Sequence, residues 1–206
     1  MHIPSTTTDK LQILTFQDAL KAANTPNDEY DIERWIYAPN FYSEYRYILG
    51  TRGSNPLICI GINPSTAKPD DLDNTLKSVE RIALGNGFDS FIMFNVYAQR
   101  ATKPDDMERQ CNLALHHENM EAFRYVLSIS EKPVVWAAWG AIIEKRGYLS
   151  ECVRDMVAVG QDFSASWQCA GAISKKGHPH HPLYLRKDEK LKPFDVEGYL
   201  NMLGEK

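Results

Sequence analysis

The segment "LICIGINPSTAKPDD", residues 57–71, decides the fold. It begins with a continuous apolar run, which is typical of a strand covered on both faces, and it changes at Gly61 to small polar residues and prolines. Buried strands that alternate with amphipathic helices indicate a parallel sheet with helices on its faces. In such sheets, ligands bind beyond the carboxyl ends of the strands. The polar stretch at 63–66 is therefore expected at a binding site.

The rest of the chain continues this alternation. Strands are expected at 42–51, 55–62, 90–98, 133–140 and 167–172, and helices at 73–86, 106–128, 141–160 and 195–203. Asp73 is expected to cap the first of these helices. We predict an α/β fold of three layers, α/β/α, around a central, mostly parallel sheet of four to five strands. The chain is expected to form one domain, 1–206, in which residues 1–40 are an N-terminal helical and loop extension.

The composition is that of an ordinary globular protein. Hydrophobic residues make up 43% of the chain and charged residues 24%, and no apolar stretch approaches the roughly 18 residues that cross a bilayer. The start, "MHIPSTTTDK", lacks the basic-then-apolar pattern of a signal peptide, so we expect a cytoplasmic protein. The net charge of −4 argues against a nucleic-acid coat protein, but it is compatible with a local basic surface.

The cysteine and histidine spacings predict neither a metal site nor a cofactor. The four cysteines are scattered without a CxxC spacing, which predicts reduced thiols; they are Cys59, Cys111, Cys152 and Cys169. Three histidines within 178–181 suggest a metal, yet no convincing carboxylate or cysteine partner accompanies them.

Four motifs, in order along the chain, carry a resemblance to the uracil-DNA glycosylase superfamily. "GINPS" (61–65) resembles its first motif, which reads GINPG in the mismatch-specific branch, and "MFNVY" (93–97) resembles the strand whose asparagine reads the base. "WAAWG" (136–140) resembles the strand that ends in tryptophan-glycine, and "HPHHPL" (178–183) resembles the closing His-Pro-Ser-Pro-Leu loop. The signatures NPSTA, RAT and HPLYL are also similar to those of an uncharacterised bacterial family.

The resemblance implies hydrolysis of an N-glycosidic bond. Asn63 occupies the position that holds the attacking water, and its amide can accept a hydrogen bond from water and aim it. The alternative is that Asn63 forms a turn before Pro64. A histidine from the last motif would donate to the departing base, which is worth roughly 10²–10³ in rate. The motif has one residue more than its counterpart, so both His181 and His178 are candidates, with His181 favoured.

Residues of the first three motifs are candidates to bind the substrate base; they are Ile62, Pro64, Ser65, Asn95, Tyr97 and Trp139. Asn95 offers a donor and an acceptor to a pyrimidine edge, or it is a buried asparagine satisfied by a neighbouring loop. Tyr97 is the better candidate to stack on the base, because it stands at the carboxyl end of the expected strand. Trp139 is a second candidate for stacking, although a core position is favoured.

A basic segment near the C-terminus is a candidate DNA contact. Cations of 175–192 would hold phosphates and an apolar tip would enter the duplex; the candidates are Lys175, Lys176, Leu183, Tyr184, Arg186 and Lys187. The alternative is a solvated charged face. Arg100 binds a phosphate or braces its loop, with bracing slightly favoured. DNA is thus the expected partner. We expect the protein to act as a monomer and not to bind a membrane.

The leading hypothesis is a monofunctional DNA glycosylase that flips a nucleotide and leaves an abasic site. The small side chains of "NPST" allow uracil or a large modified pyrimidine, such as a hydroxymethylated or glucosylated cytosine of phage DNA, which implies a role in host defence. One alternative is a nucleoside or nucleotide N-glycosidase or deoxyribosyltransferase, which the acidic composition favours. A second alternative is a non-catalytic nucleotide-binding module.

Overall fold

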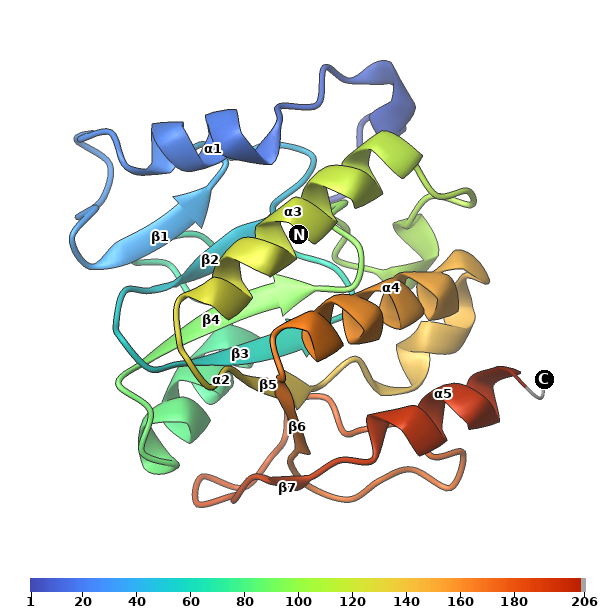
Figure 1. Ribbon diagram of the computed structural model, residues 1–206. Helices are drawn as coiled ribbons and strands as arrows, with labels where there is room; N and C mark the ends of the chain where they lie inside the picture. The colour runs from blue at the N-terminus through green and yellow to red at the C-terminus, as the bar shows by residue number, and fades with distance from the viewer. Residues whose placement is uncertain (205–206) are drawn as a thin grey trace.

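The computed structural model describes residues 1–204 and contains an open, mixed sheet with helices on both faces (Figure 1). The strands are β1 (Trp35–Ala38), β2 (Ile48–Thr51), β3 (Pro56–Gly61), β4 (Ser90–Asn95), β5 (Val134–Ala137), β6 (Ser166–Cys169) and β7 (Lys192–Pro193). The α-helices are α1 (Phe16–Ala23), α2 (Asn74–Gly85), α3 (Leu113–Ser128), α4 (Tyr148–Asp162) and α5 (Val196–Gly204). Short 3₁₀ helices lie at Thr8–Lys10, Pro104–Asp106 and Gly140–Lys145.

The sheet confirms the predicted α/β class but has more strands than expected. Its seven strands follow the order β1-β2-β4-β3-β5-β6-β7, and the inner four, β4-β3-β5-β6, are parallel. β1, β2 and β7 add antiparallel edges, so the expected number of four to five strands is wrong. β1 was expected to be part of an extension, and β7 has only two residues, which is too short for a hydrophobic alternation to reveal it.

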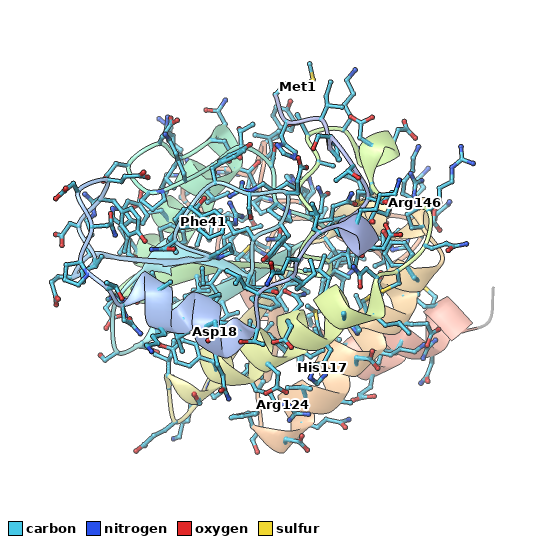
Figure 2. The ribbon with its side chains drawn as sticks, turned by 90° about the horizontal axis from the view of Figure 1, so that it is seen from above. Met1, Asp18, Phe41, His117, Arg124 and Arg146 are labelled. Atoms are coloured by element: carbon cyan, nitrogen blue, oxygen red, sulfur yellow. The ribbon has the colours of Figure 1, made fainter. Side chains whose placement is uncertain are left out.

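Alternate side chains of the central strand enter two cores. Ile58 and Ile60 pack on the face covered by α1, α3, α4 and α5, whereas Leu57 and Cys59 pack on the face covered by α2. Figure 2 shows α1, α3 and α4 side by side along one face of the sheet. Because both faces are covered, the central strand is apolar throughout, as its sequence predicts.

The helix ends have local causes. Asp73 caps α2 as predicted, since its Oδ1 accepts a hydrogen bond from the Leu76 N–H at 2.9 Å. The helix expected at 106–128 begins only at Leu113, where the Asn112 side chain accepts from the first free backbone N–H groups. The residues that precede α3 form a short 3₁₀ helix, Pro104–Asp106, followed by a loop.

The register brings the ends of the inner strands to one edge of the sheet. Gly61 is paired with Asn95, and Ile60 is paired with Ala137. The segments that follow β3, β4 and β5 therefore leave the sheet side by side (Figure 1). Within residues 1–204, no helix has the length and apolarity needed to cross a membrane, and all four cysteines are free thiols.

Candidate functional site

The loop after β3 holds the Asn63 amide in one orientation. Asn63 Nδ2 donates to the carbonyl oxygens of Ala101 at 2.7 Å and Pro64 at 3.0 Å. The part of the chain that the structure describes offers Asn63 Oδ1 no hydrogen-bond donor, and the residue is half-buried. An amide fixed in this way presents its oxygen as an acceptor, which is the group that a water molecule needs.

The neighbours of Asn63 divide between core and rim. The Ile62 side chain is buried in the larger core, and Pro64 is also buried, so the prediction that both contact a substrate is wrong for this conformation. Ser65 is half-buried, and its hydroxyl lies 3.0 Å from the Thr102 hydroxyl. Ser65 thus stays at the rim, where it joins the loops that follow β3 and β4.

Asn95 is a bracing residue rather than an exposed reader of bases. Its side chain is fully buried at the end of β4. In the orientation that satisfies its surroundings, its amide nitrogen donates to the carbonyl oxygens of Asn63 at 3.2 Å and Phe94 at 3.3 Å. This is the alternative considered above, a buried asparagine satisfied by the neighbouring loop.

Both aromatic candidates for stacking lie in the core, which contradicts the stacking prediction for Tyr97 and agrees with the core position favoured for Trp139. The Tyr97 hydroxyl donates to Glu108 Oε1 at 2.9 Å and accepts from the Asn112 N–H at 2.8 Å, and burial raises the pKa of Tyr97. The buried Trp139 donates through Nε1 to the Tyr199 hydroxyl at 2.9 Å. Tyr97 lies just past the end of β4, but the loop before α3 and the Tyr148 ring of α4 cover it.

Arg100 braces its loop and does not reach a DNA surface. Its side chain is fully buried, and its guanidinium donates to the Ser65 carbonyl and, at 2.9 Å, to the Tyr37 hydroxyl. The bracing interpretation is therefore correct, and direct contact with a phosphate is wrong for this conformation.

The structure separates the two candidate histidines. The His178 side chain has no exposed surface; its Nδ1 lies 3.0 Å from the Tyr199 hydroxyl and its Nε2 lies 3.3 Å from Glu144 Oε1. His178 thereby ties its loop to α5; it belongs to the lining of the same cavity as His181, but its buried ring is occupied by these two contacts, which favours His181 as the catalytic candidate. His181 is half-buried and lines a cavity of about 500 Å³ together with Gly140, Leu183 and Tyr184.

The protonation state of His181 follows from its surroundings. Its Nδ1 accepts a hydrogen bond from the Leu183 N–H at 3.2 Å, so the neutral ring carries its proton on Nε2. Burial lowers the pKa of His181, the neighbouring His180 lowers it further, and Asp73 opposes both. The ring is therefore neutral at physiological pH and has one N–H to donate.

The loop that carries His181 packs against α2 and the end of β5. Ser78 Oγ of α2 donates to the Pro182 carbonyl at 2.9 Å. A Cβ placed on Gly140, just beyond β5, would lie 3.6 Å from the His181 Cβ. Since Ile60 pairs with Ala137, Asn63 and Gly140 stand at equivalent places past two neighbouring strands. Asn63 and His181 therefore belong to the same edge of the sheet.

The tip of this loop is the most exposed aromatic feature of the described chain. Tyr184 is 91% exposed, and its φ of 72° is a conformation that residues other than glycine rarely adopt and that is often found at functional sites. Leu183 is half-buried. The predicted wedge is thus a single projecting ring.

Only two of the four predicted phosphate-binding cations next to this tip are without an opposite charge. Lys176 pairs with Glu144 at 2.6 Å, and Arg186 pairs with Asp188 at 3.3 Å. Lys175 and Lys187 are exposed and form no ion pair with any residue of 1–204. These two lysines are the cations that a phosphate would meet first.

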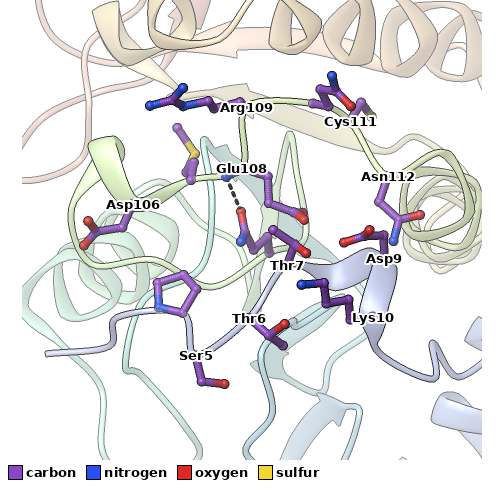
Figure 3. Close-up of a pocket in the computed structure, with 14 residues that line it drawn as sticks. Ser5, Thr6, Thr7, Asp9, Lys10, Asp106, Glu108, Arg109, Cys111 and Asn112 are labelled. Carbon is purple, nitrogen blue, oxygen red and sulfur yellow. Dashed lines mark hydrogen bonds between the residues drawn. The ribbon is translucent and has the colours of Figure 1, made fainter.

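A larger cavity, of about 720 Å³, lies where the N-terminal segment crosses the loop before α3 (Figure 3). Its floor includes Glu108, which accepts hydrogen bonds from the N–H and the hydroxyl of Thr8, both at 2.7 Å. Arg146 holds the same loop through the carbonyl oxygens of Met107 and Glu108. None of the predicted site residues lines this cavity, and no sequence motif pointed to it. Among the described residues, no group of three His, Cys, Asp or Glu side chains is placed to hold a metal ion.

Comparison with known proteins gives one match. No curated protein and no solved structure matches the chain significantly. A family model matches residues 46–183, which is more than half of the chain and extends from the end of the segment before β2 to the loop that carries His181. The chain therefore belongs to the family described as protein of unknown function (DUF1643).

Proposed function

We propose that this protein is a monofunctional DNA glycosylase that hydrolyses the N-glycosidic bond of a damaged or modified pyrimidine. The observation that carries the proposal is the neutral His181, which has an N–H to donate and lines a cavity three residues before the exposed Tyr184. A fixed donor of this kind stabilises the negative charge that develops on the carbonyl oxygen of a departing base.

The chemistry needs only the side chains at this edge and a water molecule. As the bond between the sugar C1′ and the base nitrogen breaks, its electron pair leaves with the base and the sugar becomes oxocarbenium-like. Asn63 Oδ1 accepts a hydrogen bond from a water molecule, whose oxygen then forms a bond to C1′ and whose proton passes to solvent or to the released base. The amide aims the water rather than deprotonating it.

Two features of the fold support the resemblance to the uracil-DNA glycosylase superfamily. The parallel core β4-β3-β5-β6 has helices on both faces, and the motifs follow its strands at one edge. The antiparallel edges β1, β2 and β7 depart from the expected sheet. Small side chains at Ser65 and Thr66 leave room for a bulky modified pyrimidine, such as a glucosylated cytosine of phage DNA, and such a substrate would imply a role in defence against phage.

The surface near His181 supports DNA as the partner. Tyr184 projects from a loop that also carries Lys187, and Lys175 lies in the preceding turn. An aromatic ring can replace the flipped base in the stack while the lysines contact phosphates. The net charge of −4 makes this a local rather than a global attraction.

The test incubates the protein with oligonucleotides that carry uracil, thymine mismatches and modified cytosines, and with phage genomes. Alkali-labile breaks and released bases are measured by mass spectrometry. We expect base release that falls on the order of 10²–10⁴-fold in Asn63→Ala and at least 10²-fold in His181→Ala, with DNA binding retained. Lys132→Ala, an exposed lysine before β5, is the control. Full activity of either site variant, or no released base from any substrate, would contradict the proposal.

The same assay on free nucleosides separates the alternative of a nucleoside N-glycosidase. A DNA glycosylase is expected to leave nucleosides intact and to lose DNA binding steeply with salt. Nucleoside turnover that does not change in the double variant Lys175→Ala, Lys187→Ala would favour the alternative.

A further inference from the structure

Two arginines lie buried together beneath the loop that follows Asn63. Arg46 is 1% exposed and Arg100 is fully buried. Arg46 donates to the Ala67 carbonyl at 3.1 Å, and Arg100 donates to the same oxygen at 3.4 Å, so the two guanidinium groups meet at one carbonyl. The Nε atom of each has no hydrogen-bond partner.

This pair is a local excess of positive charge. No ion pair within residues 1–204 includes either arginine, although Asp73 acts on Arg46 and Glu44 acts on Arg100 through space. Burial and the charge of Arg100 lower the pKa of Arg46 to about 9, which still leaves both groups charged at neutral pH. Buried charges are costly unless they are compensated, so this region of the protein favours an anion.

A cavity of about 480 Å³ lies next to the buried pair, separated from Arg100 by the side chains of Tyr37 and Tyr42. Its lining consists of Glu29, Tyr30, Tyr37, Tyr42, Thr66, Lys68 and Pro69. Arg100 stands behind two of these residues: it donates to the Tyr37 hydroxyl at 2.9 Å, and its guanidinium carbon lies 4.3 Å from the centre of the Tyr42 ring.

The exposed groups of this cavity have the chemistry of a nucleotide site. Tyr42 is 47% exposed, so one ring can accept a stacked base while a cation supports it from behind. Lys68 is exposed, and it belongs to no ion pair of the described residues. Tyr30 also lines the cavity, and its hydroxyl is buried.

We propose that this cavity binds a nucleotide unit, with its base stacked on Tyr42 and its phosphate at Lys68 and Thr66. Glu29 would accept a hydrogen bond from an amino group or a sugar hydroxyl. The unit is either a free mononucleotide or one nucleotide of a DNA strand, because both present a base and a phosphate. This inference does not depend on the proposed glycosylase activity, because the cavity would bind a nucleotide even if the protein had no hydrolase activity.

Calorimetric titration of the full chain tests the site, with thymidine 5′-monophosphate, thymidine, inorganic phosphate and a short single-stranded oligothymidylate as probes. We expect the nucleotide to bind more tightly than thymidine or phosphate and to weaken as salt rises. Tyr42→Ala and Lys68→Ala should each raise Kd on the order of tenfold. Tyr42→Phe, which keeps the ring, and Lys132→Ala, which removes a remote lysine, should leave Kd within about twofold of the wild type.

The probes also identify the source of the nucleotide. Binding of the monophosphate supports a free nucleotide, whereas binding of the oligonucleotide alone supports a strand; in both cases the effect must depend on Tyr42 and Lys68. Unchanged Kd values in Tyr42→Ala and Lys68→Ala, or no binding of either nucleotide probe, would overturn the inference. His181→Ala should retain this binding, so a chain that binds nucleotide but releases no base refutes the glycosylase and leaves the nucleotide site supported.

Discussion

Replacement of Tyr97 by Phe should destabilise the protein, because the Tyr97 hydroxyl joins the segment after β4 to the loop before α3. It donates to the Glu108 carboxylate at 2.9 Å and accepts from the Asn112 N–H at 2.8 Å, and the side chain has no exposed surface. A hydrogen bond to a charged group contributes about 1.5–3 kcal/mol and an ordinary one about 1 kcal/mol. We therefore expect Tyr97→Phe to lower the free energy of unfolding by about 2–4 kcal/mol, and Tm by roughly 5–15 °C.

The assay is urea unfolding followed by tryptophan fluorescence, which reports on the buried Trp35, Trp136 and Trp139. Tyr184→Phe is the matched control, because it removes a hydroxyl from a ring that is 91% exposed and should change the free energy of unfolding by less than about 0.5 kcal/mol. If Tyr97→Phe were as mild as this control, the hydroxyl would not join these segments.

Three further predictions concern the candidate site and its surface. Since burial lowers the pKa of His181, the folded protein binds fewer protons than the unfolded chain when the pH falls below the ordinary pKa of 6.5. The contribution of His181 to the free energy of unfolding is therefore full above pH 6.5 and declines as the pH falls toward the lowered pKa. Urea unfolding at pH 5–7.5 should show this decline in the wild type and not in His181→Gln. Asn95→Asp should destabilise the protein by roughly 3 kcal/mol or more, because it sets a buried carboxylate against the carbonyl oxygens of Phe94 and Asn63; a stable variant with an altered base preference would return Asn95 to the role of base reader. The double variant Lys175→Ala, Lys187→Ala should reduce the slope of log K for duplex binding against log salt by up to about 2, whereas Lys176→Ala, whose lysine is already paired with Glu144, should change it less.

The elements of the fold that could be predicted are those whose local sequence pattern is compatible with only one kind of secondary structure. The apolar run of β3 and the periodic helix α2 with its Asp73 cap were both expected from the sequence, and both are confirmed. β1 and β7 were missed because strands at sheet edges pair through the backbone and need no long hydrophobic run.

The candidate site was predicted less completely, because burial depends on contacts distant in the sequence. Whether a strand end is open depends on what covers it, and the residues that cover Tyr97 and Trp139 come from the loop before α3 and from α5. The choice between His178 and His181 likewise depended on α5, since the partner of His178 is Tyr199. Arg100 was a candidate from the sequence, but its pairing with Arg46 was not predicted, because the two arginines are 54 positions apart and come together through the pairing of Tyr45 with Gln99 and at the Ala67 carbonyl.

The central claim is that the neutral imidazole of His181 and the oriented amide of Asn63 act on one bond between a sugar and its base. The most direct measurement is the rate of base release from modified phage DNA by the wild type, His181→Ala, Asn63→Ala and the double variant, with DNA binding measured in parallel. We predict that each single variant binds DNA and loses at least about 10² in rate, and that the double variant loses less than the product of the two, because the groups share one transition state. Base release at the wild-type rate in His181→Ala would contradict the account.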